Sequence, residues 1–229
     1  KAWKSFVDIK IPKKMKNLKK KTKTYSEYES KLLLKKYGIS VPKSLITNKK
    51  NILRDYKKIG FPLVAKINSN TVFHKTEIGG VVTNINSEKE LKKKTKKFTG
   101  NILIEKMITD NVFEMIIGIK NDNEFGPTII LGAGGIYTEL FKDTTTLLLP
   151  LTKRMIVEEI KKLKFSKILF GFRGKKGGDI KSLVNIILKI AKFAEKNSDK
   201  VSEVDINPLI VCKKGKGVFA VDALIHYFD

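Results

Sequence analysis

The sequence has little cysteine, few acidic residues and no long apolar run. Cys212 is the single cysteine of 229 residues, which excludes an internal disulfide and a cysteine-only metal cage and favours a reducing, cytoplasmic compartment. No apolar stretch approaches the roughly 20 residues of a membrane-spanning helix, and no secretion signal follows the basic start. We therefore expect a cytoplasmic protein without a membrane segment.

Because acids are scarce, 47 Lys and Arg face 23 Asp and Glu, which gives a net charge of +24. Such a charge favours anionic partners. Only Arg54, Arg154 and Arg173 are arginine, and the lysines are spread over the whole chain. A nucleic-acid-binding module would gather its cations on one face between aromatic residues, so this function is disfavoured, and the salt dependence of binding would test it.

The chain is 41% apolar, enough to build a core. We expect residues 1–23 to form a basic arm. Ser26 and Glu29 then form a capping box, and Leu32, Leu33 and Tyr37 predict the apolar face of a helix that ends at Gly38.

Apolar runs and turn residues beyond this helix predict strands alternating with helices. The expected strands are 61–67, 81–85, 101–108, 113–120, 127–131, 201–212 and 217–225, and the expected helices are 87–98, 152–163 and 180–196. This pattern indicates an α/β protein. No linker is long enough to separate independent domains.

Lys66 interrupts the apolar strand 61–67. If its side chain points inward, the ammonium needs a buried anion, and a phosphate would satisfy it. If the strand is half-buried, Lys66 simply faces solvent. The residue alone does not decide between the two interpretations.

His74 stands in a polar loop, residues 74–80 (HKTEIGG), beside a cation, a carboxylate and two glycines. A neutral imidazole can accept a phosphoryl group and pass it on. An exposed histidine without a role is the alternative interpretation.

Residues 132–135 (GAGG) follow a predicted strand and match neither the P-loop nor the dinucleotide-binding fingerprint. Their backbone N–H groups are able to contact phosphate oxygens, although a tight structural turn explains the glycines as well.

Glu203, Asp205 and Asn207 alternate with apolar residues and so share one face of a strand. Asp222 lies on the next predicted strand. Oxygen ligands of this kind suit Mg²⁺, which takes one or two from protein and the others from water and phosphate. A solvated outer face is the alternative.

Several segments occur in an order that resembles one family. They are the helix start at residues 25–29 (YSEYE), the strand 60–66 (GFPLVAK), the loop 74–80, the turn at 125–127 before the glycine cluster, and 203–208 (EVDINP) with 221–223. Together they resemble the β subunit of ADP-forming acetyl-CoA synthetase, which has an ATP-grasp fold and is related to the succinyl-CoA synthetase β subunit. The resemblance runs from about residue 24 to the end.

The resemblance implies a two-lobed α/β ATP-grasp fold, with residues 24–108 as the first lobe and 109–229 as the second, and a nucleotide between the lobes. It also implies a role for individual residues. Lys66 would contact the phosphates, Glu105, Lys106, Met107 and Ile108 would form the adenine-side hinge, and Glu114 would lie near the ribose; Asn207 and Asp222 would hold Mg²⁺, His74 would carry the phosphoryl group and Asp205 would orient it. Glu139 and Arg173 match family positions whose roles are less defined.

The implied reaction is acyl-CoA + ADP + phosphate ⇌ acid + ATP + CoA. The chain shows no CoA-binding half, so the resemblance implies an α subunit as partner, in an α2β2 assembly. An ATP-grasp ligase or acyltransferase module without phosphohistidine is the alternative, and it would need Lys66 and Asn207 but not His74.

Overall fold

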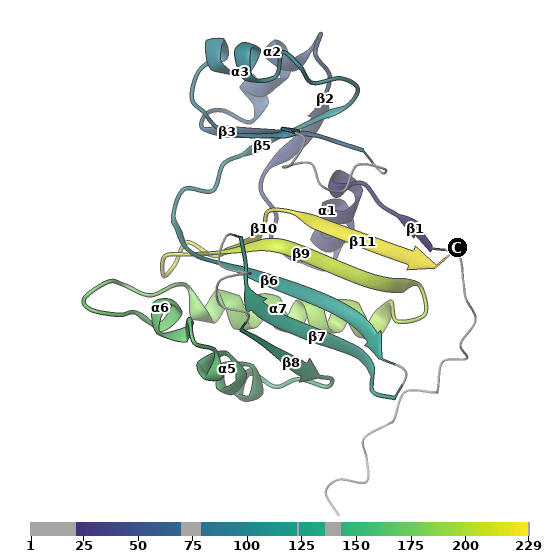
Figure 1. The fold of residues 1–229 in the computed structure, drawn as a ribbon, viewed down its shortest axis with the longest axis vertical. Helices are drawn as coiled ribbons and strands as arrows, with labels where there is room; N and C mark the ends of the chain where they lie inside the picture. The colour runs from purple at the N-terminus through teal and green to yellow at the C-terminus, as the bar shows by residue number, and fades with distance from the viewer. Residues whose placement is uncertain (1–21, 70–78, 123, 136–142, 229) are drawn as a thin grey trace, which may run out of the picture.

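The computed structural model describes residues 22–69, 79–122, 124–135 and 143–228. Within these residues the chain forms a four-stranded and a seven-stranded sheet, which Figure 1 shows one above the other. No helix in the described part is long and apolar enough to cross a membrane.

The four-stranded sheet has the order β2 (Ser44–Thr47), β5 (Ile102–Lys106), β3 (Leu63–Ile67) and β4 (Val81–Ile85), with antiparallel neighbours. Three short helices accompany it: α2 (Ile52–Asp55), the 3-10 helix η2 (Tyr56–Lys58) and α3 (Glu88–Lys94). We call residues 44–106 the small lobe. Ile52, Leu91 and Phe98 pack with one face of the strands in its apolar core.

The seven-stranded sheet has the order β1 (Thr22–Thr24), β11 (Ala223–Phe228), β9 (Val201–Cys212), β6 (Asn111–Asp122), β7 (Gly126–Ala133) and β8 (Thr144–Leu148), while β10 (Val218–Ala220) pairs with β9. All neighbours are again antiparallel. The middle of β6 alternates: Phe113, Met115 and Ile117 are buried, and the residues between them are half-buried.

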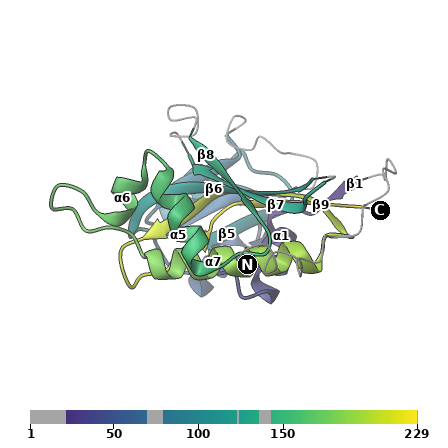
Figure 2. The same ribbon diagram turned by 90° about the horizontal axis from the view of Figure 1, so that it is seen from below.

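Helices α5 (Lys153–Lys162) and α7 (Ile180–Lys196) cover one face of this sheet, as Figure 2 shows. Helix α6 (Ser166–Phe170) lies between them in sequence. The side chains of Thr152 and Asp179 cap α5 and α7, because each accepts a hydrogen bond from a backbone N–H of the first turn. The two helices expected at 152–163 and 180–196 are therefore confirmed.

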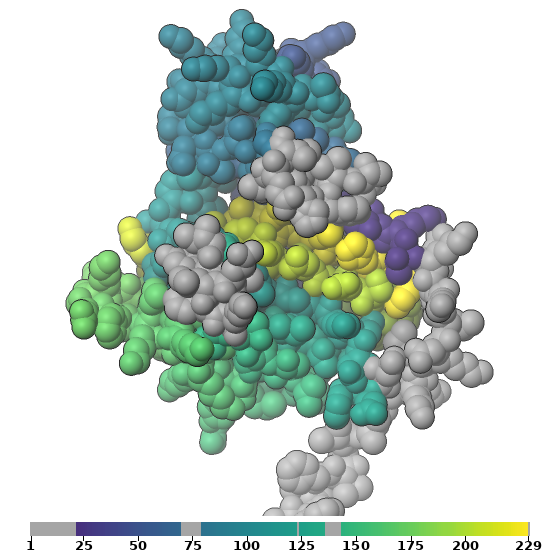
Figure 3. All heavy atoms as spheres, viewed as in Figure 1, coloured from purple at the N-terminus to yellow at the C-terminus, as the bar shows by residue number. Residues whose placement is uncertain are grey.

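Helix α1 (Glu27–Lys36) belongs by packing to the large sheet, although the sequence analysis grouped it with the first lobe. Leu34 and Ile39 join the core of the large sheet, and β1 pairs with β11. The sheet and core of the small lobe begin only at Ser44. We call residues 22–41 and 111–228 the large lobe. In Figure 3 the small lobe, in blue, rests on the yellow strands near the C-terminus.

Candidate functional site between the lobes

Helix α1 brings two charged side chains to the boundary between the lobes. The capping box at its start is formed as expected: Ser26 Oγ accepts from Glu29 N, and Glu29 Oε2 accepts from Ser26 N at 2.8 Å. Glu27 and Lys31 then lie one turn apart on the same side of the helix, and each is only 1% exposed.

The small sheet presents two further charges toward α1. Val64 pairs with Glu105 and Lys66 with Leu103, so all four side chains share one face of the sheet. The opposite face carries Leu63, Ala65, Ile102 and Ile104, which lie in the apolar core of the small lobe. Lys66 and Glu105 are therefore turned away from that core and toward the large lobe.

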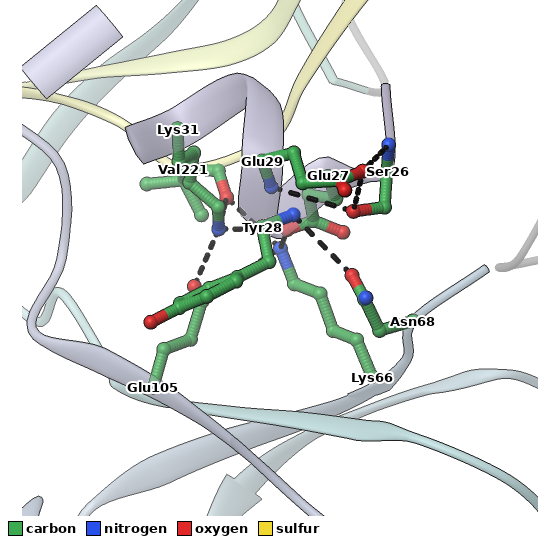
Figure 4. A network of polar contacts seen from close by, with 9 residues as sticks. All are labelled: Ser26, Glu27, Tyr28, Glu29, Lys31, Lys66, Asn68, Glu105 and Val221. Carbon is green, nitrogen blue, oxygen red and sulfur yellow. Dashed lines mark hydrogen bonds and ion pairs between the residues drawn. The ribbon is translucent and has the colours of Figure 1, made fainter. Parts of the chain in front are cut away.

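Four charges and one backbone carbonyl meet here, and Figure 4 shows them between α1 and the small sheet. Lys31 Nζ lies 2.5 Å from Glu105 Oε2, 2.7 Å from Glu27 Oε1 and 2.8 Å from the Val221 carbonyl oxygen. Lys66 Nζ lies 2.6 Å from Glu27 Oε1, 2.8 Å from Glu105 Oε1 and 2.9 Å from the same Val221 oxygen. We call these residues the interlobe ion cluster.

The cluster decides between the two interpretations of Lys66 that the sequence left open. Its side chain points inward, is 4% exposed and is paired with carboxylates. Burial alone would lower the pKa of Lys66, but Glu105, Glu27 and Asp222 together raise it above its usual value. Lys66 is thus a permanent cation.

Asn207 of β9 and Asp222, the predicted metal ligands, are brought together by the fold. The strand expected at 217–225 is interrupted, and Asp222 lies in the bend between β10 and β11. Asn207 N donates to the Asp222 carbonyl oxygen at 3.2 Å. Asp222 directly follows Val221, whose carbonyl holds Lys66 and Lys31. The described residues include no group of three or more His, Cys, Asp or Glu side chains able to hold a metal. One carboxylate and one amide nevertheless fit Mg²⁺, which takes its other oxygens from phosphate and water.

The glycine turn after β7 lies beside Asn207. Gly135 N approaches Asn207 Oδ1 at 3.4 Å, and Gly134 N donates to the Glu114 carbonyl oxygen at 2.8 Å. A Cβ on Gly134 would lie 2.6 Å from the Met115 backbone, so the close approach of the two strands requires glycine there. The half-buried Glu114 accepts a hydrogen bond from Asn111 Nδ2 at 3.1 Å. Glu114 and Asn207 therefore flank one turn.

Asp205 lies on the face of the large sheet opposite α7, where Gly118 and Leu224 are its neighbours on adjacent strands. It keeps contact with solvent, yet desolvation by surrounding groups and, next, the Glu203 carboxylate raise its pKa, while His226 lowers it. The expected shared face of Glu203, Asp205 and Asn207 is confirmed by their common exposure between buried neighbours.

The expected hinge, residues 105–108, is where the chain passes from the small to the large lobe. The Glu105 side chain is committed to the ion cluster. Lys106 Nζ donates to the Phe61 carbonyl oxygen, and Met107 N donates to the Pro62 carbonyl oxygen at 3.1 Å. Ile108 is half-buried.

His74 and Glu139 lie outside the described residues. The segment that carries His74 leaves from the end of β3, where Ile67 N donates to the Gly80 carbonyl oxygen at 2.8 Å. Asn68 Oδ1 also accepts from Tyr28 N at 3.3 Å, so the segment begins next to α1. Arg173 is described, and it lies over the Phe172 ring, 5.2 Å from its centroid.

The expected apolar face of α1 is wrong in one respect. Leu32 is 44% exposed, and the buried residues of the helix are Glu27, Ser30, Lys31 and Leu34. Charged residues on a helix normally indicate a solvated face, so the sequence analysis missed Glu27 and Lys31 as site residues. The one local signal is that Glu27 and Lys31 are four residues apart in a helix whose start is marked by a capping box.

The chain has two lobes, each with its own sheet, and a lysine that reaches from the small sheet toward carboxylates of the large lobe. This is the arrangement of an ATP-grasp domain. A family model described as an ATP-grasp domain matches residues 16–226. The expected fold class is confirmed.

Individual relatives indicate which group of ATP-grasp proteins the chain resembles. The chain is 36% identical over 212 residues to the β subunit of acetate–CoA ligase [ADP-forming] II of Pyrococcus furiosus. The aligned part covers 87% of this chain and 89% of that subunit. It is 37% identical to 4-hydroxybutyrate–CoA ligase [ADP-forming] of Nitrosopumilus maritimus, of which it spans only 31%. The chain therefore belongs to the ATP-grasp family, in the group of the β subunits of ADP-forming acetate–CoA ligases.

Solved structures of related enzymes have a similar fold. Acetyl-coenzyme A synthetase 1 of Candidatus Korarchaeum cryptofilum, in complex with coenzyme A and Ca-AMPCP, superposes with a TM-score of 0.82 at 32% identity, covering 90% of this chain and 94% of that one. A complex of the same enzyme with Mg-AMPPCP, described with its phosphohistidine segment pointing towards the nucleotide-binding site, gives 0.79 at 34% identity, with 90% and 93% covered.

Proposed function

We propose that the chain is the nucleotide-binding subunit of an ADP-forming acyl-CoA synthetase and that it transfers a phosphoryl group from His74 to ADP. With a partner subunit the overall reaction is acyl-CoA + ADP + phosphate ⇌ acid + ATP + CoA. The observation that carries the proposal is the hydrogen bond from Lys66 Nζ to the Val221 carbonyl oxygen, which places the small-lobe lysine next to Asp222 of the large lobe.

The nucleotide would lie where these residues converge. Lys66 brings positive charge to the phosphates, Glu114 lies on the ribose side, and residues 105–108 line the adenine. Phosphoryl transfer depends chiefly on alignment of donor and acceptor and on neutralisation of the oxygens, so a fixed cation between two lobes suits it.

Asn207 and Asp222 would hold Mg²⁺, which when bound supplies positive charge to the phosphate oxygens. Both offer oxygen donors, and they lie on adjacent backbone segments. Asn207 Oδ1 lies 3.4 Å from Gly135 N, and an amide oxygen that accepts one hydrogen bond has a second lone pair for a metal ion.

His74 would accept the phosphoryl group through a ring nitrogen and release it to the β-phosphate of ADP. Asp205 would accept a hydrogen bond from the second ring nitrogen and so fix the tautomer. The surroundings of Asp205 raise its pKa, which means that they destabilise the ionised carboxylate. A hydrogen bond from the ring N–H would offset this destabilisation.

The partner would be an α subunit that binds CoA and forms the acyl phosphate, in an α2β2 complex of the cytoplasm. The β subunits among the relatives support a divided enzyme, and the longer ligases, of which this chain spans about a third, support a fused arrangement of the same parts.

The test is to incubate the chain with its α partner, acetyl-CoA, phosphate and Mg²⁺ and to measure acid-labile phosphate on the chain. We expect one phosphate on His74 that ADP removes with formation of ATP. The chain has two histidines, so His226→Asn is the matched control and should keep the signal. Full ATP formation by His74→Asn would favour an ATP-grasp module without phosphohistidine.

A further inference from the structure

The segment that leads from α6 into α7, residues 168–181, concentrates exposed apolar side chains. Ile168, Phe170 and Phe172 are 40%, 41% and 46% exposed. They are three of the seven large apolar residues that are exposed in the described part of the chain, and the other four are spread between positions 32 and 155. Single exposed apolar residues need no explanation, but a cluster of them is typical of an interaction surface.

Backbone contacts hold the middle of this segment in place. Gly178 N donates to the Leu169 carbonyl oxygen at 2.8 Å, and Lys175 N donates to the Phe172 carbonyl oxygen at 3.0 Å. A Cβ on Gly177 would lie 2.5 Å from the Leu169 carbonyl oxygen, so only glycine fits this close approach. The exposed side chains therefore project from an ordered turn, which lowers the entropy cost of binding through them.

Exposed cations surround the apolar side chains. The turn after β9, residues 213–216, is joined to the segment by a β-bridge between Gly178 and Lys213, and Figure 1 shows both at the same edge of the large lobe. The segment and the turn carry seven exposed cations: Arg173, Lys175, Lys176, Lys181, Lys213, Lys214 and Lys216. Among the residues that the structure describes, only Lys213 of these seven has a carboxylate within ion-pair distance, Asp110 at 3.3 Å. Asp179, the one acid of the two stretches, is buried and accepts hydrogen bonds from backbone N–H groups.

Two adjoining hollows run along these residues. One has a volume of about 650 Å³ and is lined by Ile168 and Phe172, and the other has about 1160 Å³ and is lined by Phe170. Lys176 and Lys213 line both hollows. We call the two hollows together the basic groove. It combines unpaired positive charge with an apolar centre.

The charge of the groove restricts what fits it. A second copy of the chain, with its net charge of +24, and the basic arm of residues 1–23 have the same sign of charge as the groove. A nucleic acid would match the charge, but Arg173 lies 5.2 Å from the centroid of the Phe172 ring and so covers a face on which a base would stack. A protein surface with acidic side chains around apolar ones matches both the charge and the apolar centre.

The groove begins next to the candidate nucleotide site. Asn111 lines the smaller hollow, and its Nδ2 donates to Oε1 of Glu114, the proposed ribose-side residue, at 3.1 Å. A protein seated in the groove would therefore lie beside the place to which a phosphoryl group must be delivered. This position favours the subunit that forms the acyl phosphate over an unrelated acidic protein.

We propose that the basic groove is the docking surface for the partner subunit, which presents to it acidic side chains around an apolar centre. The inference rests on the proposed function in that it needs a partner that supplies the phosphoryl group. It adds where on this chain that partner binds.

Two double substitutions test the apolar and the charged part of the groove separately, by the dissociation constant of the complex with the purified α partner. Phe170→Ser with Phe172→Ser should weaken the complex about thirtyfold or more, because two aromatic side chains no longer bury apolar surface. Lys175→Glu with Lys176→Glu should weaken it about tenfold at low salt, and the loss should shrink as salt screens the charges. Unchanged dissociation constants for both variants would overturn the inference.

Matched controls make the same kinds of change away from the groove. Phe125→Ser alters a phenylalanine that is 56% exposed, and Lys89→Glu with Lys92→Glu reverses two exposed charges on α3 of the small lobe. We expect less than about a twofold change in the dissociation constant from either control. Effects as large as those of the groove variants would mean that the net charge or a general loss of stability weakens the complex, and so would contradict the proposal.

A docking role also predicts what the groove variants keep. Their thermal unfolding and their binding of Mg-ADP as the chain alone should match wild type, because the replaced side chains are exposed and lie outside the nucleotide site. Binding of single-stranded DNA that the lysine variant abolishes, with an unaffected subunit complex, would assign the groove to nucleic acid and overturn the inference. So would the absence of any complex between the wild-type chain and the α partner. The proposed function fails in a different way: the complex would form but would make no ATP from acetyl-CoA, ADP and phosphate.

Discussion

The two faces of the central strands of the small sheet, β3 and β5, are both withdrawn from solvent, but by different means. One face places Leu63, Ala65 and Ile104 in an apolar core, while the other places Lys66 and Glu105 against α1. Apolar contact is non-directional and tolerates small shifts, whereas ion pairs and hydrogen bonds require defined atoms at defined distances. The charged face therefore fixes how the small lobe is set against the large one, and the apolar face holds the small lobe itself together.

The largest expected effect comes from removing one charge of the charged face. Glu105→Gln should lower the free energy of unfolding by about 3 to 5 kcal/mol, because two buried ammonium groups would then share one carboxylate. Ile104→Ala, one residue away on the apolar face, should cost about 2 to 5 kcal/mol through lost burial and a cavity. Urea denaturation measures both.

The comparison of the two faces fails if Glu105→Gln costs far less free energy of unfolding than Ile104→Ala. A cost of Glu105→Gln below about 0.5 kcal/mol, which is usual for a surface position, would mean that the charged face is open to water. A normal cost for Ile104→Ala in the same experiment would show that the small lobe remains folded as described.

A smaller effect is expected at a buried acid whose partners, in the part of the chain that the structure describes, are N–H groups and not a cation. Burial raises the pKa of Asp179, but the N–H groups of Ser182, Gly217 and Gly215 outweigh this and lower it below its usual value. Asp179→Asn should cost about 1 to 2 kcal/mol at pH 7, because an amide oxygen accepts these bonds less strongly.

The pH dependence of this cost follows from linkage. The native pKa lies below the unfolded value of about 4, so the unfolded state binds the proton first on acidification. The stabilisation by Asp179 is complete above about pH 4 and is lost as the pH falls through the native pKa. Unfolding of wild type and Asp179→Asn between pH 7 and 3 should therefore converge, and a constant difference would contradict the assignment.

The smallest effect concerns the helix that carries half of the ion cluster. Ser26→Ala removes the capping box but no cluster charge, so it should cost only about 1 kcal/mol. It should also leave the Mg-ADP dissociation constant within about twofold of wild type. A tenfold weakening would show that the position of α1 itself contributes to nucleotide binding.

Much of the fold is predictable from local pattern. The capping residues Ser26, Thr152 and Asp179 mark the starts of three helices, and the two-residue period of 201–212 identifies β9 together with the shared face of Asp205 and Asn207. The short strands β2 and β8 and helix α6 were not predicted. They have few residues and weak periodicity, so their assignment depends on pairing and packing with distant segments.

The site was predictable where a motif supplied several residues at once. Asn207 and Asp222 lie close together as expected, since a backbone hydrogen bond joins them, and the Lys66 side chain reaches across the two lobes to Val221, the residue before Asp222. Glu27 and Lys31 were not predictable, because nothing local distinguishes a buried Glu–Lys pair on a helix from an exposed one.

By itself the sequence determined the periods, the caps and the order of motifs, because each depends on residues within a few positions of one another. Only the tertiary structure decided which charges are buried. A carboxylate or ammonium leaves water only when partners of opposite charge arrive from elsewhere in the chain. Lys66, Glu105, Glu27 and Lys31 are such partners, and they meet only once the two lobes lie together.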